Sequence, residues 1–137
     1  MAKRILALDV GTKRIGVAIT DPLCIFSHEL KLVLRENDKK AQDEIRSLAR
    51  EYKVEKIVVG LPYNTDGSIG FQAENCMNFV KPLENEFKIV YCDERYSSSE
   101  AEELLRKENK KYTKNKGLVD LKAACLILED YLRTGEQ

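Results

Sequence analysis

The chain has 137 residues, of which 43% are hydrophobic and 34% charged, so it can form one domain with a solid core and is not a disordered protein. Lysine plus arginine number 23, as do aspartate plus glutamate, so the formal net charge is zero and a generally basic nucleic-acid-binding protein is excluded. No stretch is long and apolar enough to predict a membrane span, and we expect a single domain over residues 1–137.

The beginning of the chain predicts a β-meander. An apolar run over residues 4–8 predicts a buried strand that ends at Asp9, and a polar break separates it from a second strand over 15–20. Residues 25–34 predict a third strand after a short turn. Strands joined by such short connections pair antiparallel.

Helices and strands alternate in the rest of the chain. Apolar residues at helical spacing predict a helix over 38–52, with Asp38 as its N-cap, and another over about 70–86. Short apolar runs predict strands over 55–60 and 88–92. The remaining predicted elements are a short helix over about 98–108, a basic loop over 109–117 and a last helix over about 118–133.

This order, β-β-β-α-β-α-β-α-α, predicts an α/β fold with a mixed five-stranded sheet. The first three strands form the antiparallel meander, and the helical crossovers make the last two strands parallel. The helices then cover the faces of the sheet. In such sheets functional groups gather at the carboxyl ends of the strands.

Acidic residues occupy three positions that this fold would bring together. Asp9 ends the first strand, Asp93 and Glu94 end the last one, and Asp120 lies in the first turn of a final helix that is apolar nearly all round. Each position also has an ordinary explanation: an Asx turn at Asp9, a solvated loop at Asp93 and Glu94, and a helix-start aspartate at Asp120.

A shared site would place these carboxylates side by side, where they repel one another unless a cation lies between them. Carboxylate oxygens suit Mg²⁺ or Mn²⁺. Two such ions can activate water and stabilise the leaving oxygen in phosphodiester hydrolysis. The acidic positions therefore indicate a metal-dependent hydrolase as one interpretation.

Positive charge gathers near the same positions. The segment from Arg106 to Lys116 is strongly basic and is either a solvated loop or an element that grips phosphates directly before Asp120. The candidate nucleic-acid-binding residues are Lys13, Arg14, Arg95, Lys110, Lys111, Lys114 and Lys116.

The cysteines and the single histidine predict no further site. Cys24, Cys76, Cys92 and Cys125 are far apart and each lies in an apolar context, which is typical of reduced thiols in a cytoplasmic protein rather than a zinc site. His28 has no assigned role.

Four segments, in this order along the chain, resemble the YqgF family. They are DVGTKRIGVA at 9–18, GLPYNTDGS at 60–68, DERYSS at 93–98 and KGLVDLKAACLILE at 116–129. Members of that family are described as pre-16S rRNA nucleases or Holliday-junction-resolvase-like proteins. The four motifs together span essentially the whole chain.

The resemblance implies a ribonuclease-H-like fold and a cytoplasmic nuclease, a hydrolase acting on ester bonds, that matures the 5′ end of pre-16S rRNA in ribosome biogenesis. It implies that Asp9, Glu94 and Asp120 are catalytic and bind Mg²⁺ or Mn²⁺, with Asp93 able to replace or support Glu94. The expected partner is structured RNA, with branched DNA as the alternative, and the expected state is a monomer or weak homodimer with no membrane contact.

Two interpretations from other classes remain. An Asp-x-Gly-Thr turn after a strand also cradles nucleotide phosphates in ATPases and sugar kinases, but those enzymes close two lobes around the nucleotide and this chain supplies one. A non-catalytic RNA-binding module of the same fold would bind RNA without cleaving it. The acidic positions favour catalysis, because a pure binder gains nothing from anions placed beside phosphates.

Overall fold

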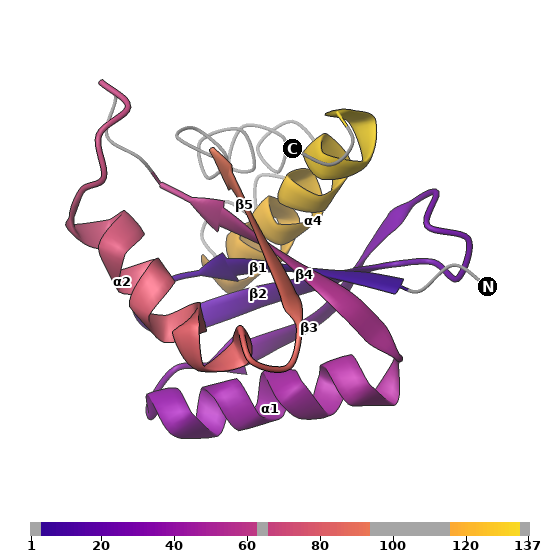
Figure 1. Cartoon of the computed structure of the whole chain (residues 1–137), viewed down its shortest axis with the longest axis horizontal. Helices are drawn as coiled ribbons and strands as arrows, with labels where there is room; N and C mark the ends of the chain where they lie inside the picture. The colour runs from indigo at the N-terminus through magenta and orange to yellow at the C-terminus, as the bar shows by residue number, and fades with distance from the viewer. Residues whose placement is uncertain (1–3, 63–65, 94–115, 135–137) are drawn as a thin grey trace.

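The sheet of this protein has five strands in the order β3-β2-β1-β4-β5 (Figure 1). The computed structural model describes residues 4–62, 66–93 and 116–134. The strands are β1 (Arg4–Val10), β2 (Arg14–Thr20), β3 (Ser27–Leu34), β4 (Val54–Leu61) and β5 (Lys88–Asp93). β1, β2 and β3 pair antiparallel, while β4 pairs parallel with both β1 and β5. The predicted mixed α/β fold is confirmed.

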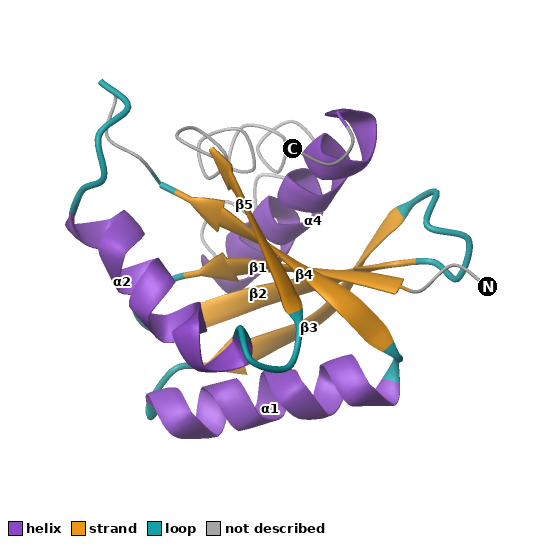
Figure 2. Cartoon of the chain, in the orientation of Figure 1, coloured by secondary structure: helices purple, strands orange, loops and turns teal. Residues whose placement is uncertain are grey.

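Helices cover both faces of this sheet (Figure 2). The described helices are α1 (Asp38–Glu51), α2 (Phe71–Val80), the 3-10 turn η1 (Lys81–Leu83) and α4 (Lys116–Thr134). α1, α2 and η1 pack on one face and α4 on the other. No helix among the residues described here has the length and apolar character needed to cross a bilayer.

Side-chain size differs between the two faces and follows the alternation of the strands. Leu6 and Leu8 of β1 point toward α1 and α2, whereas Ala7, between them, points toward α4. Ala18 of β2 also faces α4 and is fully buried. Small residues on this face allow α4 to approach the sheet closely.

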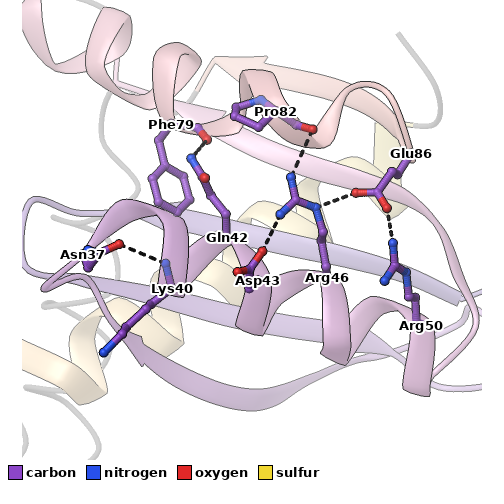
Figure 3. Close-up of polar contacts among 9 residues, drawn as sticks. All are labelled: Asn37, Lys40, Gln42, Asp43, Arg46, Arg50, Phe79, Pro82 and Glu86. Atoms are coloured by element: carbon purple, nitrogen blue, oxygen red, sulfur yellow. Dashed lines mark hydrogen bonds and ion pairs between the residues drawn. The ribbon is translucent and has the colours of Figure 1, made fainter.

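Polar contacts join α1 to α2 and to the segment that follows α2 (Figure 3). The side-chain amide of Gln42 donates to the carbonyl oxygen of Phe79 at 2.8 Å. Glu86 accepts from both Arg46 and Arg50. These contacts hold α2 against α1 and so fix its position relative to the sheet.

Two details of the first two predicted helices are wrong. The N-cap of α1 is Asn37, whose side chain accepts from the backbone N–H of Lys40, while Asp38 pairs with an arginine instead. The helix predicted over 70–86 ends at Val80 as an α-helix, because Pro82 has no N–H to continue it and the chain tightens into η1.

The last helix begins earlier than the sequence predicts. α4 starts at Lys116 rather than 118, which places Asp120 in the second turn and not the first. The predicted helix over 98–108 and the part of the predicted 109–117 loop up to residue 115 lie outside the described residues, while residues 116 and 117, predicted as loop, begin α4. All four cysteines are thiols, and Cys76 and Cys125 are buried.

Candidate active site

Asp9 lies on β1 one residue before the end of the strand. It pairs with Gly16 of β2 and is the second residue after Ala7, so its side chain projects from the face that α4 covers. The strand places this carboxylate there because the apolar run before it anchors β1 in the middle of the sheet.

Gly16 brings α4 to this point. A Cβ placed on Gly16 would lie 2.2 Å from the carbonyl oxygen of Asp120 and 3.1 Å from the backbone nitrogen of Leu121. Any other residue would therefore hold the helix away from the sheet. Since Gly16 is the partner of Asp9 across the ladder, this close approach carries Asp120 to the neighbourhood of Asp9.

The electrostatics of the pair are those of two carboxylates sharing one site. Burial, and then the negative charge of Asp120, raise the pKa of Asp9 to about 7. Asp120 has a positive partner, because Arg14 Nε donates to its Oδ2 at 3.2 Å. Asp9 is thus the carboxylate whose charge is disfavoured at neutral pH.

A cavity of about 200 Å³ contains both carboxylates, and we call it the carboxylate cavity. It lies at the carboxyl end of β1, and its walls come from β1, the turn after it, the residue that follows β4, the first turns of α2, and α4. Its lining residues are Asp9, Val10, Gly11, Thr12, Pro62, Phe71, Gln72, Asn75 and Asp120.

A buried arginine supports the wall of the carboxylate cavity. The side chain of Arg35 is 7% exposed, and its Nη1 donates to the carbonyl oxygen of Gly11 at 2.9 Å and to Oδ1 of Asn75 at 2.7 Å. Its Nε donates to Asp38 at 2.9 Å, and its guanidinium lies 4.7 Å from the ring centroid of Phe79. One side chain thus ties the turn after β1 to both α1 and α2.

The contact with Arg35 also orients Asn75. A guanidinium has no acceptor, so the amide oxygen of Asn75 must face it. The amide nitrogen, a donor of two hydrogen bonds, is then the group that Asn75 can offer to the carboxylate cavity.

The structure brings some of the predicted site residues together. Asp9 and Asp120 both line the cavity, and Arg14 forms an ion pair with Asp120 that the sequence did not predict. Lys13 is exposed in the turn after β1. Glu94, Arg95, Lys110, Lys111 and Lys114 lie outside the described residues, and Lys116 is described only as the first backbone position of α4.

Asp93 lies at the end of β5, on the face of the sheet opposite to the one from which Asp9 projects. Val90 and Cys92 pack on the α4 side, and Ile89 and Tyr91 on the α1 side, so alternation places Asp93 with Tyr91. Within the described ranges no group of three or more acidic, cysteine or histidine residues is placed to hold a metal ion.

Comparisons with known proteins agree with this architecture. A family model described as "RuvX: Holliday junction resolvase" matches residues 3–134. A protein of Sulfurihydrogenibium sp. is 42% identical over 133 residues, which cover 94% of this chain and 89% of that protein. One of Crocosphaera subtropica is 43% identical over 129 residues, covering 93% and 90%. Both carry the name "Putative pre-16S rRNA nuclease".

Solved structures show the same fold at much lower identity. RuvC of T. thermophilus in complex with a Holliday junction substrate is 15% identical with a TM-score of 0.55, covering 98% of this chain and 97% of that one. The Fowlpox virus resolvase, in complex with Holliday junction DNA, is 14% identical with a TM-score of 0.57, covering 96% and 97%. At such identity these structures support the ribonuclease-H-like fold and nothing finer.

Proposed function

From the premise that this chain belongs to the RuvX (YqgF) family, we propose that it is a single-domain, metal-dependent nuclease that matures the 5′ end of pre-16S rRNA in the cytoplasm. The observation that carries the proposal is the convergence of Asp9 and Asp120 in one cavity at the carboxyl edge of the sheet. The names of the relatives that are 42–43% identical support RNA as the substrate.

The residues present fit a divalent cation. Asp9 and Asp120 offer only oxygen ligands, and burial, followed by the negative charge of Asp120, raises the pKa of Asp9, a penalty on its ionised form that a cation beside it would offset. Asp9 and Asp120 would hold Mg²⁺ or Mn²⁺, with Glu94 as the third ligand by its place in the DERYSS motif. We favour Glu94 over Asp93 because strand alternation directs Asp93 to the opposite face. Such ions neutralise phosphate charge and activate water.

The protein's own groups would bind and orient the substrate. The amide nitrogen of Asn75 can donate to a phosphate oxygen in the cavity, and Arg35 holds that amide in place. Lys13, Arg95 and the lysines of the 106–116 segment would contact phosphates further along the backbone.

Branched DNA is the second candidate substrate, because the family model carries the description of a Holliday junction resolvase. The deciding experiment incubates the protein with pre-16S RNA, linear duplex DNA and a four-way DNA junction in parallel, each with Mg²⁺, Mn²⁺ or EDTA. Cleavage at the 5′ end of the 16S sequence that stops in EDTA and with Asp9→Asn is the expected result. Binding of RNA without cleavage of any substrate would identify a non-catalytic RNA-binding module instead.

A further inference from the structure

An aromatic ring stands uncovered at the edge of the carboxylate cavity. Phe71, the first residue of α2, is 84% exposed. Among the described residues, no other large hydrophobic side chain is as exposed. It lines the same cavity as Asp9 and Asp120. Exposure of a whole phenyl ring to water is unfavourable, so a ring at this place is suited to a ligand that covers it.

The ring is held on a rigid element. Phe71 and Asn75 are one helical turn apart and therefore share a face of α2. Arg35 donates a hydrogen bond to the side chain of Asn75, and Gln42 of α1 donates one to the carbonyl oxygen of Phe79 at the other end of the helix. Phe71 is thus presented to the cavity by a helix anchored at two points.

The charge of the cavity explains why an uncharged contact is useful there. Its titratable lining residues, Asp9 and Asp120, are both acidic, so without a cation beside them they repel the phosphates of a nucleic acid. The chain as a whole has no net charge to offset this repulsion. Stacking of a base on an aromatic ring depends little on charge or sequence, because every base has a π-face.

We propose that Phe71 is a stacking platform for an unpaired nucleobase next to the phosphate that enters the carboxylate cavity. The proposal rests on the nuclease function proposed above and specifies its substrate class: nucleic acid with an unpaired nucleotide at the cleavage site. A base inside a continuous duplex is stacked on its neighbours and cannot present its face to a ring on a helix. Fully paired nucleic acid is therefore a poor ligand for this site.

The chain has no tryptophan, so Phe71→Trp creates a unique fluorescent probe at the platform. The matched control is Phe26→Trp, because Phe26 is 64% exposed but lies in the turn between β2 and β3, at the opposite end of the sheet. Both are made in an Asp9→Asn background, which prevents cleavage and removes a repulsive charge.

Titration with oligonucleotides then measures stacking on the ring at position 71 by the quenching of its fluorescence. We expect a single-stranded oligonucleotide to quench the indole fluorescence of the Phe71→Trp protein strongly and that of the Phe26→Trp protein little. A blunt duplex should quench neither protein. Absence of quenching in the Phe71→Trp protein, or equal quenching in both proteins, overturns the proposal.

Cleavage assays separate this proposal from the proposed function. Phe71→Ala should raise KM by roughly 5- to 150-fold, the range expected for loss of one base stack, with a smaller change in kcat, and Phe71→Tyr should restore most of the loss. Thermal unfolding of both variants should match the parent, because the ring is exposed. If the parent cleaves and Phe71→Ala cleaves equally well, the platform is wrong and the nuclease stands. If the Phe71→Trp protein is quenched but the parent cleaves nothing, the platform stands and the nuclease assignment fails.

Discussion

The backbone of α4 passes so close to Gly16 that a Cβ on this residue would lie 2.2 Å from the carbonyl oxygen of Asp120. Gly16 is the ladder partner of Asp9, so one glycine connects the strand that carries the first carboxylate to the helix that carries the second. The separation of the two acidic side chains therefore depends on a residue that has no side chain.

Gly16→Ala tests this dependence. The added methyl group must push α4 outward, and we expect a loss of ~1–3 kcal/mol or more in the free energy of unfolding, together with loss of nuclease activity. Urea unfolding measures the first and the cleavage assay the second. Gly70→Ala is the control, since Gly70 has an ordinary φ of −96° and the loss of a favoured N-cap residue should cost no more than about 1 kcal/mol. Equal effects of the two substitutions would contradict the prediction.

Arg35→Lys tests the support of the cavity wall. Lysine keeps the charge but cannot reach Gly11, Asn75 and Asp38 at once, so two acceptors lose a charge-assisted donor in a nearly buried place. We expect ~2–3 kcal/mol of destabilisation in chemical unfolding and faster hydrogen exchange in the first turns of α2.

The matched control for this change is Arg50→Lys on the exposed side of α1. Arg50 pairs with Glu86 and its side chain is 64% exposed, so its replacement should change stability by less than about 0.5 kcal/mol. A similar loss of stability in both variants would show that Arg35 contributes no more than an exposed ion pair does.

The basic segment before α4 gives a prediction about binding. Neutralising Lys110, Lys111 and Lys114 together should weaken nucleic-acid affinity and flatten its dependence on salt, by about 0.7 unit of log–log slope for each phosphate of a single strand that is no longer neutralised. Binding titrations at several salt concentrations, with the Asp9→Asn protein to prevent cleavage, measure the slope. An unchanged slope would assign these lysines to a solvated loop without a role in binding.

The sequence predicts the sheet well because its strands are short apolar runs between polar breaks. The same pattern places Asp9 at the carboxyl edge and Asp120 on the last helix, and the structure brings both to one cavity. Their role in catalysis stays a prediction.

Arg35 and Phe71 could not be identified from the sequence because their positions depend on contacts between distant segments. Arg35 is bonded to Asn75, forty residues away, and an arginine after a strand otherwise indicates a solvated charge. Phe71 begins a predicted helix, and only the structure shows that it is 84% exposed and lines the carboxylate cavity. The N-cap of α1 could not be identified from the sequence either, because Asn37 and Asp38 are both favourable N-cap residues. The structure shows that Asn37 has the extended backbone conformation of an N-cap.

The last prediction concerns the raised pKa of Asp9 and needs no substrate. In the unfolded chain the pKa of this carboxyl is near its ordinary value of 3.8, and in the folded protein it is about 7. Between these values the folded state holds a proton that the unfolded state has released, so the stability of the metal-free protein should fall as pH rises from about 4 to about 7, and then level off. Three pH units correspond to ~4 kcal/mol as an upper limit.

Asp9→Asn cannot release that proton, so the variant should lack this part of the pH dependence and be more stable than the parent at about pH 8 in EDTA. Mg²⁺ or Mn²⁺ should reverse the order, because a cation bound between Asp9 and Asp120 stabilises the parent by mass action and the variant much less. Asp120→Asn is a less direct probe, since it also replaces the charged partner of Arg14 with a neutral amide. Urea unfolding of the parent and Asp9→Asn across pH, with and without metal, tests both statements. Parallel pH profiles with equal metal responses would mean that Asp9 neither titrates near neutrality nor binds the ion.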